Sequence, residues 1–179
     1  MTTRVASRVP DDVGRVLSAV EEAAQGTKLW CGAAAAMAWF GGRRGRKAAV
    51  TGLAAVAVAQ LLANGLGKQL TDRPRPPREW IPHDGVDDRP DSSSFPSGHT
   101  AAAVAFTAAV ARSWPQAGGV CAVPAAMVAV ERVQSGAHHP SDVVTGAAVG
   151  LAGAWLVRRA PRLWLRQRLW RRRARAFPG

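Results

Sequence analysis

Residues 48–67 read AAVTGLAAVAVAQLLANGLG, twenty residues without a charged side chain. A helix of that length extends about 30 Å, which matches the hydrocarbon core of a bilayer. This stretch therefore predicts a transmembrane helix. It also decides how the shorter apolar stretches around it are interpreted.

Four other uncharged stretches share its small-residue composition, and they cover residues 29–42, 100–111, 115–130 and 143–157. By length alone, each is equally consistent with a buried helix of a soluble bundle. Their many alanines and glycines are typical of helices that pack closely inside membranes. We therefore expect an all-α, multi-pass transmembrane bundle with about five spans.

The two ends of the chain differ from this apolar centre. Residues 11–25 place apolar side chains on one face, which indicates an amphipathic helix at an interface or an ordinary packed surface helix. The C-terminal end is rich in arginine. The expected organisation is an N-terminal amphipathic segment (1–28), a transmembrane domain (29–157) and an Arg-rich tail (158–179).

Positive charge is concentrated in two places. The chain has 24 Lys and Arg residues against 12 Asp and Glu, a net charge of +12. Residues 43–47 and 158–179 together hold 13 of the 24 cations. If each apolar stretch spans once, these two clusters share one side, and the loops 68–99 and 131–142 share the other. The positive-inside rule then predicts a cytoplasmic C-terminal tail, and the Ala, Arg and Gly bias favours a bacterial plasma membrane.

A basic tail of this kind is also found in proteins that bind nucleic acid. The rest of the chain has no recognisable nucleic-acid motif, and it contains no tyrosine to stack on bases. We therefore expect membrane lipids as partners rather than nucleic acid. The sequence carries no signal for oligomeric state.

Two polar clusters on the predicted outer side carry candidate site residues. KQLTDRPRP (68–76) offers Lys68 and Arg75, although a helix-terminal lysine followed by a basic loop explains this cluster better when it is taken alone. PSGH (96–99) places Ser97 to cap a helix, Gly98 to let a ligand approach and His99 to donate a proton. A helix N-terminus binds anions. An ordinary cap with a surface histidine is the alternative.

The third cluster, ERVQSGAHHPSD (131–142), contains Arg132, His138 and Asp142. An aspartate four residues after a histidine is placed to hold one ring nitrogen and leave the other free to attack. A carboxylate in the first turn of a helix is the plain structural alternative for Asp142. His139 competes for the same role, but the spacing favours His138.

Together the three clusters supply fixed cations, a helix N-terminus, two histidines and a carboxylate. This set suits phosphoryl transfer, because lysine and arginine offset charge on the phosphoryl oxygens without a metal. No set of Asp, His and Glu residues has convincing metal-ligand spacing, and the acidic residues of 84–91 are best explained as a solvated loop. We therefore expect neither a metal nor another cofactor.

In order and spacing, K-x6-R-P at 68–76, P-S-G-H at 96–99 and R-x5-H-x3-D at 132–142 resemble the three-part signature of the type 2 phosphatidic acid phosphatase superfamily. The resemblance implies an all-α fold and hydrolysis of lipid phosphates. It implies that His138 is the nucleophile, Asp142 its orienting partner and His99 the general acid. It also implies a phosphate cradle formed by Lys68, Arg75, Ser97, Gly98 and Arg132.

One departure and two alternatives remain. The family usually has serine before the third-motif arginine, whereas this chain has Glu131, which we expect to point away from the site because neighbouring helix residues face different directions. The expected substrates are phosphatidic acid or polyprenyl phosphates, with the active site outside the cytoplasm. A vanadate-dependent haloperoxidase-like enzyme and a catalytically impaired membrane protein of the same fold are the alternatives.

Overall fold

The structure, a computed structural model, describes residues 16, 19, 27–77 and 92–176, with the backbone alone after residue 160. The elements are α2 (Lys28–Phe40), α3 (Gly42–Gln60), the π-helical segment η3 (Leu61–Gly67), α4 (Lys68–Leu70), α5 (Gly98–Ser113), α6 (Pro115–Gln134) and α7 (Pro140–Ala176). No strand occurs within these ranges. The amphipathic helix expected over residues 11–25 lies almost entirely outside them.

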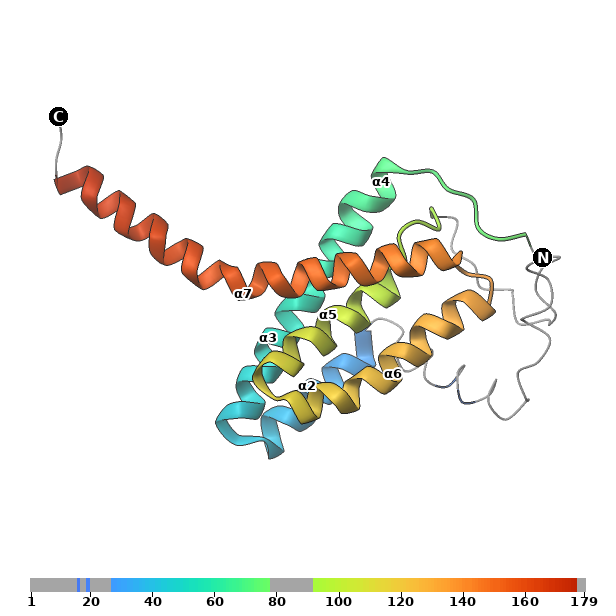
Figure 1. The fold of residues 1–179 in the computed structure, drawn as a ribbon, viewed down its shortest axis with the longest axis horizontal. Helices are drawn as coiled ribbons and strands as arrows, with labels where there is room; N and C mark the ends of the chain where they lie inside the picture. The colour runs from blue at the N-terminus through green and yellow to red at the C-terminus, as the bar shows by residue number, and fades with distance from the viewer. Residues whose placement is uncertain (1–15, 17–18, 20–26, 78–91, 177–179) are drawn as a thin grey trace.

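Each of the five apolar stretches lies in a helix, and the prediction of an all-α bundle is confirmed. α3, η3 and α4 follow one another without a break, as Figure 1 shows for the blue-green rod that ends at α4. Among the described residues, two helical segments are long and apolar enough to cross a membrane, Gly42–Leu70 and Pro140–Ala160. The number of five spans stays a prediction. α7 continues across residue 157 to Ala176, so the helix itself does not end where the Arg-rich tail begins.

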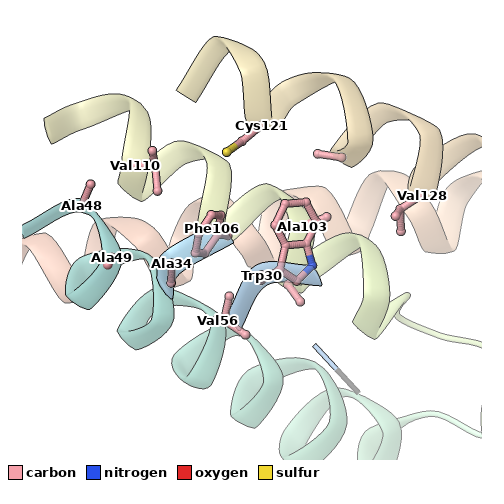
Figure 2. Packing of buried hydrophobic residues seen from close by; sticks show 12 residues of the cluster. Trp30, Ala34, Ala48, Ala49, Val56, Ala103, Phe106, Val110, Cys121 and Val128 are labelled. Atoms are coloured by element: carbon pink, nitrogen blue, oxygen red, sulfur yellow. The ribbon is translucent and has the colours of Figure 1, made fainter. Parts of the chain in front are cut away.

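α5 packs against α3, α6 and α7, and its own face is built from small residues. Ala101, Ala103 and Ala105 are fully buried, so neighbouring backbones come close to the α5 axis. Larger side chains fill the space on the α2 side. There the rings of Trp30 and Phe106 lie tilted to each other with centroids 5.2 Å apart (Figure 2).

The approach of α7 to α5 depends on glycine. A Cβ atom at Gly146 would lie 2.4 Å from the carbonyl oxygen of Ser97, and one at Gly150 would lie 2.5 Å from that of Ala101. Real side chains do not fit at such distances, so only glycine lets the two helices touch here. This contact fixes the first turns of α7 beside the N-terminus of α5.

Candidate active site

All three polar clusters lie at one end of the bundle. The long helix Gly42–Leu70 ends just after Lys68, and α6 ends just after Arg132. α5 begins after Ser97 at the same end, and α7 begins after His138 (Figure 1). Alternating helix directions therefore bring motifs that are far apart in the sequence into one region.

Two extended segments join the first cluster to the second. The Ser94 amide donates to the carbonyl of Arg73 at 3.0 Å, and the Ser94 hydroxyl donates to the carbonyl of Pro74 at 3.1 Å. The ammonium group of Lys68 donates to Ser92 Oγ at 3.3 Å. The loop after α4 is thereby held against the segment that leads into α5.

Ser97 caps α5, as its position in the sequence predicts. Its backbone is extended, and its Oγ accepts the Thr100 amide at 3.5 Å. Its own amide donates to the carbonyl of Asp142 at 3.0 Å, which ties the second cluster to the third. Gly98 is the first residue of α5, and His99 is half-buried in the same turn.

The orientation of His138 follows from a single contact. Its Nδ1 lies 2.6 Å from the carbonyl oxygen of Ser94. A carbonyl only accepts hydrogen bonds, so Nδ1 carries the proton in the neutral ring and Nε2 holds the free lone pair. The side chain is 4% exposed. The ring is therefore a buried base with one defined nucleophilic nitrogen.

The surroundings keep this ring neutral. Burial lowers the pKa of the His138 imidazole from 6.5 to about 4, and the charges of Arg75 and Arg132 act in the same direction. The Ser94 carbonyl and the Asp142 carboxylate oppose this shift, because both favour the protonated ring. At neutral pH the lone pair on Nε2 is therefore available.

Asp142 does not occupy the position expected from its spacing. Its Oδ2 lies 3.9 Å from His138 Nδ1, beyond hydrogen-bond distance, because the Ser94 carbonyl takes that proton. The fully buried carboxylate instead accepts Arg73 Nη1 at 2.7 Å and the His139 amide at 2.9 Å. Asp142 thus acts on the ring through its charge at this distance.

Arg75 and Arg132 are fixed in different ways. Arg75 donates to the carbonyls of Ala137 at 2.7 Å and Ser92 at 3.2 Å. Arg132 pairs with Glu131, whose Oε2 lies 2.6 Å from both Nε and Nη2. The expectation that Glu131 points away is therefore wrong. The side chains of Glu131 and Arg132 are mostly buried at the end of α6, where an unpaired charge is costly. Both are long enough to turn back toward each other.

Two residues that contact the site residues were not predicted from the sequence. Arg73 is the counter-charge of Asp142, and its only signal in the sequence was that it is the first of the two arginines in DRPRP (72–76). Ser94 contributes a backbone carbonyl, which any residue type would supply.

Within the described residues no group of three or more His, Cys, Asp and Glu side chains is placed to hold a metal ion.

Fold and site define a helical-bundle protein with a cationic, histidine-containing site at one end. The sequence model of the PAP2 superfamily matches residues 48–166, about two thirds of the chain. The chain therefore belongs to the PAP2 superfamily, as its three motifs predict. The two helical segments Gly42–Leu70 and Pro140–Ala160, found among the described residues, support an integral membrane protein.

Particular relatives are similar over more limited regions. The lipid A 1-phosphatase of Rhizobium johnstonii is 44% identical over 62 residues, 35% of this chain and 24% of that protein. The Rhizobium etli lipid A 1-phosphatase is 44% identical over 57 residues, 32% and 25% respectively. The chain thus matches about a quarter of the length of these curated relatives.

A solved structure shows the same fold across most of the chain. It is the transmembrane PAP2-type phosphatidylglycerolphosphate phosphatase of Bacillus subtilis, with a TM-score of 0.65 and 23% sequence identity. The similarity covers 88% of this chain and 81% of that one. At this identity, the likeness establishes the architecture.

Proposed function

We propose that this protein is a metal-independent membrane lipid phosphatase that works through a phosphohistidine on His138. The observation that carries the proposal is the Nδ1 contact with the Ser94 carbonyl, which leaves a neutral Nε2 among arginine charges. A nitrogen in that state is a good nucleophile for phosphorus. Membership of the PAP2 superfamily and the names of the relatives support a lipid phosphate as substrate.

In the first step, Nε2 of His138 attacks phosphorus and the bond from phosphorus to the lipid oxygen breaks. Lys68, Arg75 and Arg132 offset the negative charge on the phosphoryl oxygens. The phosphorylated ring becomes cationic. The Asp142 carboxylate, 3.9 Å from Nδ1, and the Ser94 carbonyl, 2.6 Å from it, stabilise that charge.

The N-terminus of α5 supplies the remaining groups. Its first amides, after the Ser97 cap and Gly98, point toward an anion and favour it through the helix dipole. His99, in the same turn, gives a proton to the departing lipid oxygen. In the second step His99 takes a proton from water, which attacks the phosphohistidine and releases inorganic phosphate.

The membrane sets where the substrate lies. The Pro140–Ala160 segment of α7 extends about 31 Å, one bilayer thickness, and the site lies at its N-terminal end. A headgroup in the site would leave its hydrocarbon chains beside the apolar helices. Phosphatidic acid, phosphatidylglycerol phosphate, polyprenyl diphosphates and polyprenyl-linked sugar phosphates all fit this placement.

The positive-inside argument favours an active site outside the cytoplasm of a bacterial cell. The cationic residues of 43–47 lie at the start of α3, and residues 158–176 of the Arg-rich tail form the C-terminal part of α7, both away from the site (Figure 1). A C-terminal alkaline phosphatase fusion, which is active only outside the cytoplasm, should be silent. An active fusion would place the site on the cytoplasmic side.

Phosphate release from detergent-solubilised phosphatidic acid, measured in EDTA, tests the activity. Wild-type protein should release phosphate, and His138→Ala should lose at least about 10³-fold, the scale seen when a covalent nucleophile is removed. His139→Ala is the matched control, because its ring contacts the Pro74 carbonyl while its amide still holds Asp142. Full activity in His138→Ala would contradict the assignment.

A further inference from the structure

A column of polar residues follows one face of the helix Gly42–Leu70. Gln60, Asn64 and Lys68 occur at intervals of four residues, which places them on the same face, one turn above another. Lys68 belongs to the proposed phosphate cradle. Asn64 and Gln60 therefore lie about one and two turns deeper along the candidate span than Lys68, on the face that leads away from the cradle.

The same amides touch the first residue of α5. A Cβ atom at Gly98 would lie 2.8 Å from Asn64 Oδ1 and 3.3 Å from Gln60 Oε1. Gly98 starts the turn that is expected to hold the phosphate. The amide pair thus borders the cradle from two sides, below Lys68 on its own helix and against the N-terminus of α5. The intervening segment η3 is π-helical, a form often found at functional sites.

The pair has unused hydrogen-bonding capacity. Asn64 Nδ2 donates to Gln60 Oε1, and among the described residues neither side chain has another partner. One such bond between two amides leaves three N–H groups and one carbonyl oxygen, whichever way the amides are turned. Thr51 on the same helix differs, because its hydroxyl donates to the carbonyls of Lys47 and Ala48.

Amide groups without hydrogen-bond partners within a membrane span are costly, and a polar ligand would satisfy them. Asn64 is exposed on the surface of the helix, so a ligand can reach it. A lipid whose phosphate contacts Lys68 would pass its next few atoms directly over Asn64 and Gln60. Those atoms differ between substrate classes. A glycerol or sugar unit carries ester carbonyls or hydroxyls there, whereas a polyprenyl chain begins with hydrocarbon.

We infer that Gln60 and Asn64 select lipids whose phosphate is attached to a glycerol or sugar unit, by hydrogen-bonding to the oxygens next to that phosphate. This inference rests on the proposed function, because it assumes that a lipid phosphate occupies the cradle. The pair takes no part in bond breaking. It determines specificity through hydrogen bonds that a glycerol or sugar unit accepts or donates and that a polyprenyl chain cannot form.

The test compares kcat/KM for dihexanoyl phosphatidic acid and farnesyl phosphate in wild type, Gln60→Met and Asn64→Leu. Wild type should prefer phosphatidic acid. Each variant should lose about tenfold on phosphatidic acid, equivalent to about 1.4 kcal/mol, and change less than about twofold on farnesyl phosphate. Thr51→Val is the matched control on the same helix and should leave both values unchanged.

Retained activity on farnesyl phosphate shows that a variant is folded. Equal losses on both lipids, or an unchanged ratio, would overturn the inference and leave the proposed function standing. If Asn64→Leu fails to fold, Gln60→Met decides, because the Gln60 carbonyl contacts Gly98 less closely than Asn64 does. A wild-type protein that releases phosphate neither from these two lipids nor from phosphatidylglycerol phosphate, a polyprenyl diphosphate or a polyprenyl-linked sugar phosphate would reject the proposed function itself, and this inference with it.

Discussion

The state of the His138 ring can be measured without substrate, by following ¹⁵N-labelled histidine in detergent micelles during a pH titration. The structure predicts that Nδ1 carries the proton and that the ring titrates with a pKa of about 4. His138→Gln assigns the resonance, since it removes one ring from a spectrum of four histidines. The nitrogen shifts report the tautomer and the pKa in one experiment.

Burial of the imidazole determines the size of the pKa shift of His138. A fall in the pKa from 6.5 to about 4 corresponds to about 3 kcal/mol in favour of the neutral ring. At pH 5 about 90% of such rings stay neutral, against about 3% for an ordinary histidine. The unfolded chain binds the extra proton in this range, so the contribution to folding stability is complete above pH 6.5 and is lost as the pH falls toward 4.

Removing one of two neighbouring charges should shift the pKa of His138 in opposite directions. Asp142→Asn removes a charge that favours the protonated ring, so it should lower the pKa of His138 further. Arg75→Gln removes a charge that disfavours it, so the pKa should rise. A wild-type pKa at or above 6.5, or a proton on Nε2, would refute the reasoning.

Three further predictions concern residues around the site. Arg73→Gln should destabilise the protein by about 2–4 kcal/mol in detergent unfolding, because it leaves the buried Asp142 carboxylate unpaired, and adding Asp142→Asn should restore part of that loss. Glu131→Gln should lower KM for phosphatidic acid by up to about tenfold with kcat unchanged, since it removes the carboxylate charge that pairs with Arg132, and an unchanged KM would mean that the pair does not compete with substrate. Gly146→Ala should cost about 1–3 kcal/mol and much of the activity by pushing α7 away from α5, whereas Gly32→Ala, which meets nothing within 4 Å, should not destabilise.

The helices could be predicted because they depend on local pattern. Runs of uncharged small residues such as 48–67 and 143–157 leave few choices other than close-packed helices. The caps could be predicted for the same reason, as Ser97 shows. The same argument treated Gln60 and Asn64 merely as uncharged members of a span, and only their contact with Gly98 distinguishes them.

The partners within the site could not be predicted, because they depend on how distant segments meet. The four-residue spacing suggested Asp142 as the partner of one ring nitrogen of His138, but a backbone carbonyl 44 residues earlier in the chain contacts Nδ1 instead. Arg73 pairs with Asp142 across 69 residues. The direction of Glu131 was predicted wrongly. Helix periodicity determines where the start of a side chain points, but the long Glu131 side chain turns back to Arg132.

The central claim is that phosphate is transferred to Nε2 of His138. Rapid alkaline quenching of the purified protein with ³²P-labelled phosphatidic acid, followed by peptide mapping at alkaline pH, tests it directly, because a phosphohistidine is stable in base and labile in acid. The account predicts a labelled protein intermediate on His138 in wild type, retained in His139→Ala and absent in His138→Ala. Labelled phosphate release by wild type, with no label on His138 at any quench time, would contradict it.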